Sequence, residues 1–174
     1  MFLVYHVDRD CHCGILLLHM RERVVILHNI RSTHNVGSIF RTADAAGISK
    51  IFLTGYTPAP LDRFLREAKS IAKVALGAEK TVPWEKVLNL GALLNRLKKD
   101  GYSIVAVEQS KRSKDYRTWK GRGKAALIFG NEVRGLSSAV LQHSNLCIEI
   151  PMQGSKESLN VSVAAGIILF HQAL

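Results

Sequence analysis

The chain has few cysteines and no long uncharged hydrophobic run. Its three cysteines, Cys11, Cys13 and Cys147, form an odd and sparse set, which does not fit a disulfide framework and favours a reduced, cytoplasmic protein. Cys11-His12-Cys13 resembles part of a metal site, but no second pair with ligand spacing follows it, so we expect no bound metal. No segment approaches the length needed to cross a bilayer, and the N-terminus lacks the cationic start of a signal peptide. We therefore expect neither export nor membrane association.

Acidic residues are also scarce. Asp and Glu number 14 against 24 Lys and Arg, which gives a formal net charge of +10. Such a surplus on a small protein favours polyanionic partners, because each neutralised phosphate releases condensed counterions. Nucleic acid is the expected partner, although a basic protein can also be merely soluble and cationic.

Length and composition predict one folded domain. The chain has 174 residues, of which 47% are hydrophobic and 22% charged, and this suffices for a single core without disordered or fibrous character. The strongly patterned sequence begins only after Met20, so we expect a single domain over residues 21–174. Residues 1–20 are expected to be either an extra edge element or an extension upstream of the true start.

Short apolar runs rich in β-branched residues alternate with helical patterns. The expected strands are Val24–Leu27, Lys50–Thr54, Ser103–Val107, Ala125–Phe129 and Leu146–Ile150. The expected helices are Val36–Ala46, Leu61–Leu76, Trp84–Lys99, Leu136–Gln142 and Ser158–Gln172. This alternation predicts an α/β fold with a mostly parallel sheet flanked by helices. The last helix is apolar on most sides, which indicates burial either at the centre of the core or under a partner subunit.

The segment Lys111–Lys124, which we call the basic segment, concentrates positive charge. Its cations are Lys111, Arg112, Lys114, Arg117, Lys120, Arg122 and Lys124. The segment contains a single acid, Asp115, and two aromatic residues, Tyr116 and Trp119, lie among the cations. On a loop between strands, this composition suits phosphate binding and stacking on bases. The alternative is a solvated connecting loop.

Three blocks of polar and glycine residues follow expected strands, at the edge where open α/β sheets bind ligands. In the first block, Asn35 is placed to cap a helix that carries Arg41, and Arg31 lies just before it. A capped helix start beside two arginines is a ready anion site, or else an ordinary surface helix.

The second block, Phe129–Leu136, runs from a strand into Gly-Asn-Glu and a further glycine, so its backbone can turn tightly and approach a ligand. Its Glu132 can accept hydrogen bonds from a ligand or from loop amides. The third block, Ile150–Ser162, places Ser158 and Asn160 at a helix start, where they can line a pocket with apolar walls.

The three blocks resemble the motifs of the SpoU/TrmH-like RNA 2′-O-ribose methyltransferase family of the SPOUT superfamily. The matching patterns are N-x-G-x-x-x-R-T-A at Asn35–Ala43, F-G-N-E-x-x-G-L at Phe129–Leu136, and I-P-M then S-L-N-V-S over Ile150–Ser162. Three motifs in the right order are far more specific than one. The resemblance implies a deep trefoil knot in the C-terminal half that forms the cofactor pocket, and a homodimer with its active site near the subunit interface.

The same resemblance implies roles for individual residues and S-adenosylmethionine as the cofactor. The cofactor-binding positions are Val107, Gly130, Ile150, Met152 and Leu159. The catalytic arginine corresponds to Arg41, and the other functional positions of the motifs are Asn35, Glu132, Ser158 and Asn160. The RNA-binding positions are expected to be Arg31 and, in the basic segment, Lys111, Arg112, Lys114, Arg117, Lys120 and Arg122.

The expected reaction moves a methyl group to a ribose 2′-hydroxyl of tRNA or rRNA. Because the sulfonium is already activated, the protein has to align the 2′-oxygen, exclude water and help to remove a proton. A guanidinium does not deprotonate near neutrality, so we expect Arg41 to bind the adjacent phosphate and to lower the proton affinity of the hydroxyl. Two alternatives stay open: a catalytically idle RNA-binding relative, and a methyltransferase that acts on an RNA base.

Overall fold

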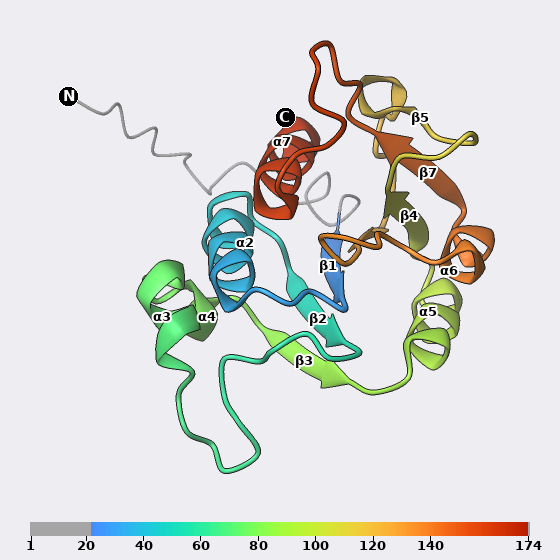
Figure 1. Cartoon of the computed structure of the whole chain (residues 1–174). Coiled ribbons are helices and arrows are strands. Elements are labelled where there is room, and N and C mark those ends of the chain that lie inside the picture. Colours follow the sequence, from blue (N-terminus) through green and yellow to red (C-terminus); the bar gives the residue numbers. More distant parts are fainter. Residues whose placement is uncertain (1–21, 174) are drawn as a thin grey trace, which may run out of the picture.

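A parallel β-sheet forms the centre of the molecule. The computed structural model describes residues 22–173 (Figure 1), so the expectation for residues 1–20 lies outside the described residues. The strands are β1 (Arg23–His28), β2 (Lys50–Thr54), β3 (Trp84–Val87), β4 (Ser103–Val107), β5 (Lys114–Asp115), β6 (Ala125–Phe129) and β7 (Leu146–Glu149). The helices are α2 (Thr33–Ala45), α3 (Lys69–Ala75), α4 (Ala78–Thr81), α5 (Leu90–Lys99), α6 (Ser138–His143) and α7 (Val161–Ala173), with a 3-10 turn η1 (Tyr116–Thr118).

Every pair of neighbouring strands runs parallel, in the order β3-β2-β1-β6-β4-β7-β5. The register places Ile26 of β1 between Phe52 of β2 and Ile128 of β6. The central strands are apolar because helices cover both of their faces, and every residue of β6 is buried. The predicted α/β fold with a parallel sheet flanked by helices is confirmed. All carboxyl ends of the strands meet at one edge, where the three sequence blocks lie.

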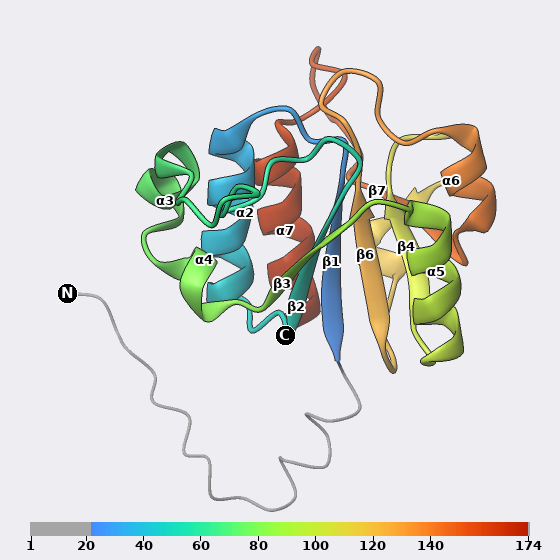
Figure 2. The same cartoon turned by 90° about the horizontal axis from the view of Figure 1, so that it is seen from below.

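Helices cover the two faces of this sheet unequally. Figure 2 shows α2, α3, α4 and α7 on one face and α5 and α6 on the other. Phe40 of α2 and Leu169 of α7 belong to one buried cluster with Leu27, whereas Leu93 and Leu97 of α5 belong to a second cluster on the opposite face. Full burial of one such side chain stabilises the fold by about 1.5–3 kcal/mol. The two clusters therefore fix the strands whose ends carry the site.

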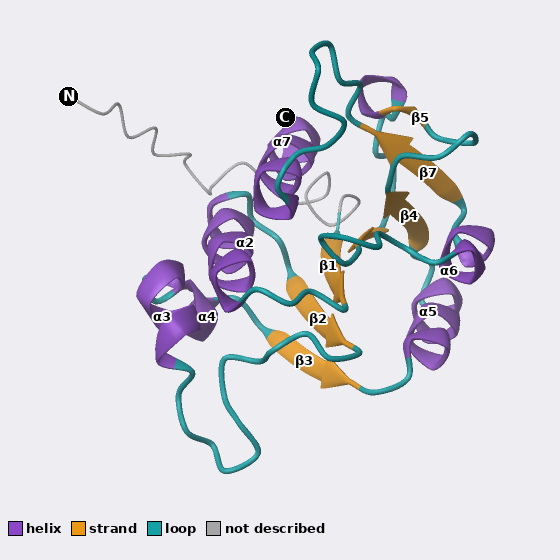
Figure 3. Cartoon of the chain, viewed as in Figure 1, coloured by secondary structure: helices purple, strands orange, loops and turns teal. Residues whose placement is uncertain are grey.

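The expected helix Leu61–Leu76 is wrong over its first half, because residues 61–68 form a hairpin-like loop (Figure 3). The Asp62 carboxylate accepts hydrogen bonds from the backbone N–H groups of Phe64 (2.8 Å) and Arg66 (3.0 Å). A bridge joins Leu61 to Glu67. Local bonds from an aspartate side chain to the backbone compete with helix formation, and here they prevail.

The expected helix Trp84–Lys99 is also wrong at its start. Residues Trp84–Val87 form β3 and pair with β2, beginning with Trp84 beside Ile51. The helix begins at Leu90, where the Asn89 side chain caps it by accepting from the Ala92 N–H at 3.0 Å. Pairing with a neighbouring strand has overridden the local helical pattern.

The last helix, α7, packs one side against α2 and leaves apolar residues exposed on another. Ala165, Ile168 and Leu169 are buried, whereas Val163 is 49% exposed and Phe170 is 47% exposed. The burial expected on most sides is therefore incomplete within one chain. Among the helices of residues 22–173, none is long and apolar enough to span a membrane.

Candidate active site

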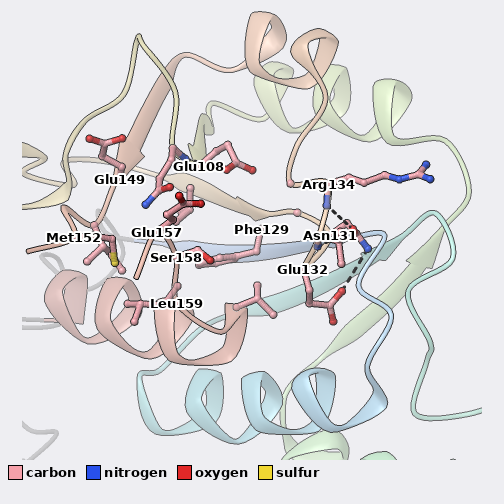
Figure 4. Close-up of a pocket in the computed structure, with 18 residues that line it drawn as sticks. Glu108, Phe129, Asn131, Glu132, Arg134, Glu149, Met152, Glu157, Ser158 and Leu159 are labelled. Carbon is pink, nitrogen blue, oxygen red and sulfur yellow. Dashed lines mark hydrogen bonds between the residues drawn. The ribbon is translucent and has the colours of Figure 1, made fainter. Parts of the chain in front are cut away.

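A cavity of about 330 Å³ opens at the carboxyl edge of the sheet (Figure 4). Its walls come from the ends of β4, β6 and β7, the loops that follow them, and the start of α7. The five residues predicted to bind a cofactor all line it, namely Val107, Gly130, Ile150, Met152 and Leu159. Two of the predicted catalytic residues, Glu132 and Ser158, line it as well. The structure thus brings the second and third sequence blocks together around one space.

The loop after β6 folds back on itself so tightly that its glycines are required. A Cβ atom on Gly130 would lie 2.6 Å from the carbonyl carbon of Gly135. Gly135 has a φ of +63°, and a Cβ atom there would collide with the Glu108 carboxylate. That carboxylate accepts from the Leu136 N–H at 2.7 Å and from the Gln109 N–H at 2.9 Å. Glycine at 130 and 135 therefore lets the loop backbone form one wall of the cavity.

The Glu132 carboxylate joins the second block to the first. It accepts hydrogen bonds from the N–H of Arg31 (3.0 Å), the N–H of Ser32 (3.1 Å) and the side-chain amide of Asn35 (3.0 Å). Partial removal from water would raise the pKa of Glu132, but hydrogen bonds from these groups and from its own backbone outweigh that effect. The pKa therefore lies below its ordinary value. Glu132 is a charged carboxylate whose oxygens are occupied by loop donors.

Asn35 extends this connection to the third block. Its side-chain oxygen accepts from the Asn160 amide at 3.2 Å, and the Asn160 oxygen accepts from the Ser162 N–H at 2.8 Å and from its hydroxyl at 2.7 Å. The chain Glu132–Asn35–Asn160, which we call the three-loop bridge, links segments about a hundred residues apart in the sequence. This arrangement explains why each of the three blocks carries an acid or an amide side chain.

The expectation that Asn35 caps the first helix is wrong. Ser32 is the cap, and its hydroxyl accepts from the Asn35 N–H at 3.2 Å. Asn35 lies in the first turn of α2 and is buried, so its side chain is available for the three-loop bridge. Arg41 lies further along α2 with an exposed side chain and does not belong to the lining of the cavity. Within one chain, Arg41 and the cavity are separate.

Sequence reasoning missed Asn131, which is buried at the turn after β6. Its amide donates to the carbonyl of Asn29 at 3.0 Å and to the hydroxyl of Tyr56 at 2.9 Å. Its oxygen accepts from the backbone N–H groups of Val133 and Arg134 at 3.0 and 2.8 Å. Asn131 thus fixes its own loop to the loops after β1 and β2. The sequence cue to Asn131 was its position between Gly130 and Glu132. An asparagine alone does not indicate a functional role, so this cue was not used.

The basic segment lies beside the far end of the sheet, where Lys114 and Asp115 form β5. Asp115 pairs with Arg117. The cations of this segment are exposed, whereas Tyr116 and Trp119 are partly buried and pack against the core. The expectation that these rings are free to stack on bases is corrected: they hold the segment to the domain.

The chemistry of the cavity suits a nucleoside-sized ligand that carries positive charge. Its volume falls within the common range of ligand pockets, about 300–1,000 Å³. Apolar side chains of Val107, Ile150 and Leu159 can cover a flat base, while the carboxylates of Glu108 and Glu157 supply negative charge (Figure 4). Within residues 22–173, no three His, Cys, Asp or Glu side chains are grouped so that they could hold a metal ion.

Comparison with known proteins agrees with this geometry. The sequence model of the SpoU rRNA Methylase family matches residues 22–170. The 23S rRNA (guanosine-2'-O-)-methyltransferase RlmB of Neisseria meningitidis serogroup B is 37% identical over 146 residues, which are 84% of this chain and 56% of that protein. The chain thus spans little more than half the length of this curated relative.

Solved structures agree in fold. The AdoMet-bound rRNA methyltransferase of Sinorhizobium meliloti superposes with a TM-score of 0.80 at 31% identity, over 88% of this chain and 56% of that one. The TrmH/SpoU tRNA modifying enzyme of A. aeolicus superposes with a TM-score of 0.77 at 31% identity, over 91% of this chain and 77% of that one. The suspected family is confirmed: with two of its motif loops around one cavity and the first motif loop bonded to both, this chain belongs to the SpoU rRNA methylase family.

Proposed function

We propose that this chain transfers a methyl group from S-adenosylmethionine to a ribose 2′-hydroxyl of tRNA or rRNA. The observation that carries the proposal is the three-loop bridge, which joins the first motif loop to the two motif loops that line a cavity of nucleoside size. The relatives support it: one is named a guanosine-2'-O-methyltransferase and another was solved with AdoMet bound.

The cofactor would occupy the cavity and would supply a methyl group already activated on a sulfonium. The residues proposed to hold it are Val107, Gly130, Ile150, Met152 and Leu159, which contribute apolar walls and close backbone. The Glu108 and Glu157 carboxylates would favour a cation in this space. Ser158 borders the cavity with an exposed hydroxyl, which suits a role at the end where the RNA enters.

We propose that Glu132, Asn35 and Asn160 position the site and do not exchange protons with the substrate. The support is that Glu132 is ionised and its oxygens accept from Arg31, Ser32 and Asn35, so it has little capacity left to act as a base. Arg41 would bind the phosphate next to the target ribose and stabilise the developing negative charge on the 2′-oxygen.

The separation of Arg41 from the cavity leads us to propose that a homodimer completes the site. Exposed Val163 and Phe170 on α7 offer an apolar surface for a second copy, and α7 packs on α2, the helix that carries Arg41. We also propose that the C-terminal loops are threaded as the trefoil knot that the family resemblance implies. The sparse cysteines support the cytoplasm as the compartment.

The RNA would contact Arg31 and the basic segment. Arg31 is exposed in the loop that Glu132 holds. Of the basic segment, Lys111, Arg112 and Lys114 are exposed and make no ion pair within the described residues. Reversing these three charges should weaken RNA binding and flatten its salt dependence, by about 0.7–0.9 in the logarithmic slope for each phosphate that the segment no longer neutralises. Unchanged binding would remove this segment from the interface.

The deciding experiment measures transfer of labelled methyl from S-adenosylmethionine to RNA that lacks its own modifications. Wild type is compared with Arg41→Ala and with a matched control, Arg96→Ala. Arg96 lies on α5, forms an ion pair with Glu85 and lies over the Phe52 ring. We expect label on a ribose, its loss in Arg41→Ala, and wild-type label in the control. Cofactor binding without transfer would favour the idle RNA-binding relative, and label on a base would favour the base methyltransferase.

A further inference from the structure

The loop between β2 and α3, residues 55–68, leaves the same edge of the sheet as the cavity and extends away from the body of the domain (Figure 1). Its stem is firmly held. The Lys86 ammonium donates to the carbonyls of Gly55 (2.7 Å) and Thr57 (2.5 Å). The Tyr56 hydroxyl accepts from Asn131, the residue that fixes the turn after β6. The stem of this loop is therefore joined by a hydrogen bond to the turn after β6, which borders the cavity.

The tip of the loop, residues 62–66, places large apolar side chains in water. Phe64 is 61% exposed and Leu65 is 80% exposed. Asp62 gives the tip a defined shape by accepting from the backbone of Phe64 and Arg66. Leu65 has a φ of +60°, a conformation that costs on the order of 1 kcal/mol for a residue with a side chain. Packing within the domain does not explain why a structured turn exposes an aromatic ring to water.

Two guanidinium groups lie against this ring. The central carbon of Arg63 is 4.7 Å from the centroid of the Phe64 ring, and that of Arg66 is 5.0 Å away. Arg66 also pairs with Asp62 at 2.7 Å, whereas Arg63 has no hydrogen bond or ion pair within the described residues. Arg63 can therefore leave the ring and reach a phosphate without breaking another contact.

Positive charge continues from the tip onto the neighbouring helix. Lys69 and Lys73 of α3 are exposed and unpaired within the described residues, while Glu67 is engaged by Lys80 at 3.0 Å. An aromatic ring beside arginines and lysines fits a single-stranded nucleic acid, because a base stacks on the ring while cations meet the backbone.

We propose that this tip binds an unpaired base of the RNA, at a nucleotide other than the one that is methylated. The Phe64 ring stacks on the base, and Arg63 moves from the ring to the phosphate of the same nucleotide. Leu65 covers the edge of the base. This inference rests on the proposed function only in that RNA is the ligand.

The test measures binding of a fluorescein-labelled 12-nucleotide RNA, as a single strand and as a blunt duplex, by fluorescence anisotropy. Phe64→Ala should weaken binding of the single strand about five- to tenfold, since one aromatic–base stack contributes that much or more, and should change duplex binding far less. Phe64→Trp should restore single-strand binding. Leu88→Ala is the matched control, because Leu88 is 88% exposed outside the loop and should bind as wild type.

Single-strand binding by Phe64→Ala equal to wild type overturns the proposal. So does a change of oligomeric state in Phe64→Ala with RNA affinity retained, because the tip would then be a protein interface. Methyl transfer is measured separately on the same variants. If wild type transfers no methyl group but Phe64→Ala still weakens single-strand binding, the proposed function is refuted and this inference stands.

Discussion

Replacing Glu132 with alanine tests the central feature of the site, the carboxylate that holds the loop after β1. The change removes the hydrogen bonds from Arg31, Ser32 and Asn35, at 3.0–3.1 Å, and a longer one from the Asn131 amide at 3.4 Å. A desolvated hydrogen bond to a charged group is worth about 1.5–3 kcal/mol. Glu132 is exposed, so water replaces much of what is removed, and we expect a net destabilisation of about 1–2 kcal/mol.

That destabilisation should appear as a fall in the thermal midpoint of about 2–8 °C, the shift expected for a chain of this size. It should also depend on pH. Folding lowers the pKa of Glu132 from its ordinary value of 4.5, so its stabilising effect is present above pH 4.5 and is lost as the pH falls through the folded pKa. The difference between wild type and Glu132→Ala should therefore be full at pH 7 and should shrink below about pH 4.5.

The assay is scanning calorimetry of wild type and variant between pH 7 and pH 3.5. Glu157→Ala serves as the matched control, because Glu157 also borders the cavity but has no hydrogen bond within the described residues. Its midpoint should follow wild type at every pH. A Glu132→Ala midpoint within 1 °C of wild type at pH 7, or a deficit that persists unchanged at pH 3.5, would refute the reasoning.

Three further predictions concern the cavity, the subunit interface and the three-loop bridge. Gly130→Ala should abolish binding of S-adenosylhomocysteine in titration calorimetry and should lower stability by about 1–3 kcal/mol because the loop is overpacked. The control Gly154→Ala, which has nothing within 4 Å of the added Cβ, should bind S-adenosylhomocysteine as wild type does. Equal affinities of the two variants would contradict the tight turn. Phe170→Asp should convert a dimer to a monomer in light scattering, and an unchanged mass would place the interface elsewhere. Asn35→Ser should lower kcat on the order of tenfold, the loss of about one hydrogen bond, with little change in cofactor affinity; an unchanged kcat would mean that the bridge is not needed for transfer.

The buried strands were predictable because their signal is local. Lys50–Thr54, Ser103–Val107 and Ala125–Phe129 agree residue for residue with the structure, since short apolar runs bounded by breakers have few other solutions. The strand β3 was missed because it is an edge strand without a fully buried residue that owes its conformation to pairing with β2. The tip at residues 62–66 was missed because one aspartate side chain reorganises a helical pattern.

The site was predictable in membership but not in contacts. Family motifs pointed to Glu132, Asn35 and Asn160, yet nothing in their spacing could show that these three side chains join end to end, because they lie 97 and 125 residues apart. The sequence also could not predict that Arg41 lies away from the cavity. Helical periodicity predicts which face of α2 carries a residue, but not how far that face lies from a loop. Asn131 and Glu108 act mainly on backbone groups, which leaves no distinct chemical signature in the sequence.

The three residues of the three-loop bridge are synthesised far apart in time, and this affects when the site can form. Synthesis starts at the N-terminus, so Asn35 is made 97 residues before Glu132 and 125 residues before Asn160. A nascent chain that ends before residue 160 lacks Asn160 and the start of α7, so it lacks one member of the bridge and one wall of the cavity. The site can therefore close only after the start of α7 has been made, and premature termination before residue 160 yields a product without a closed cavity.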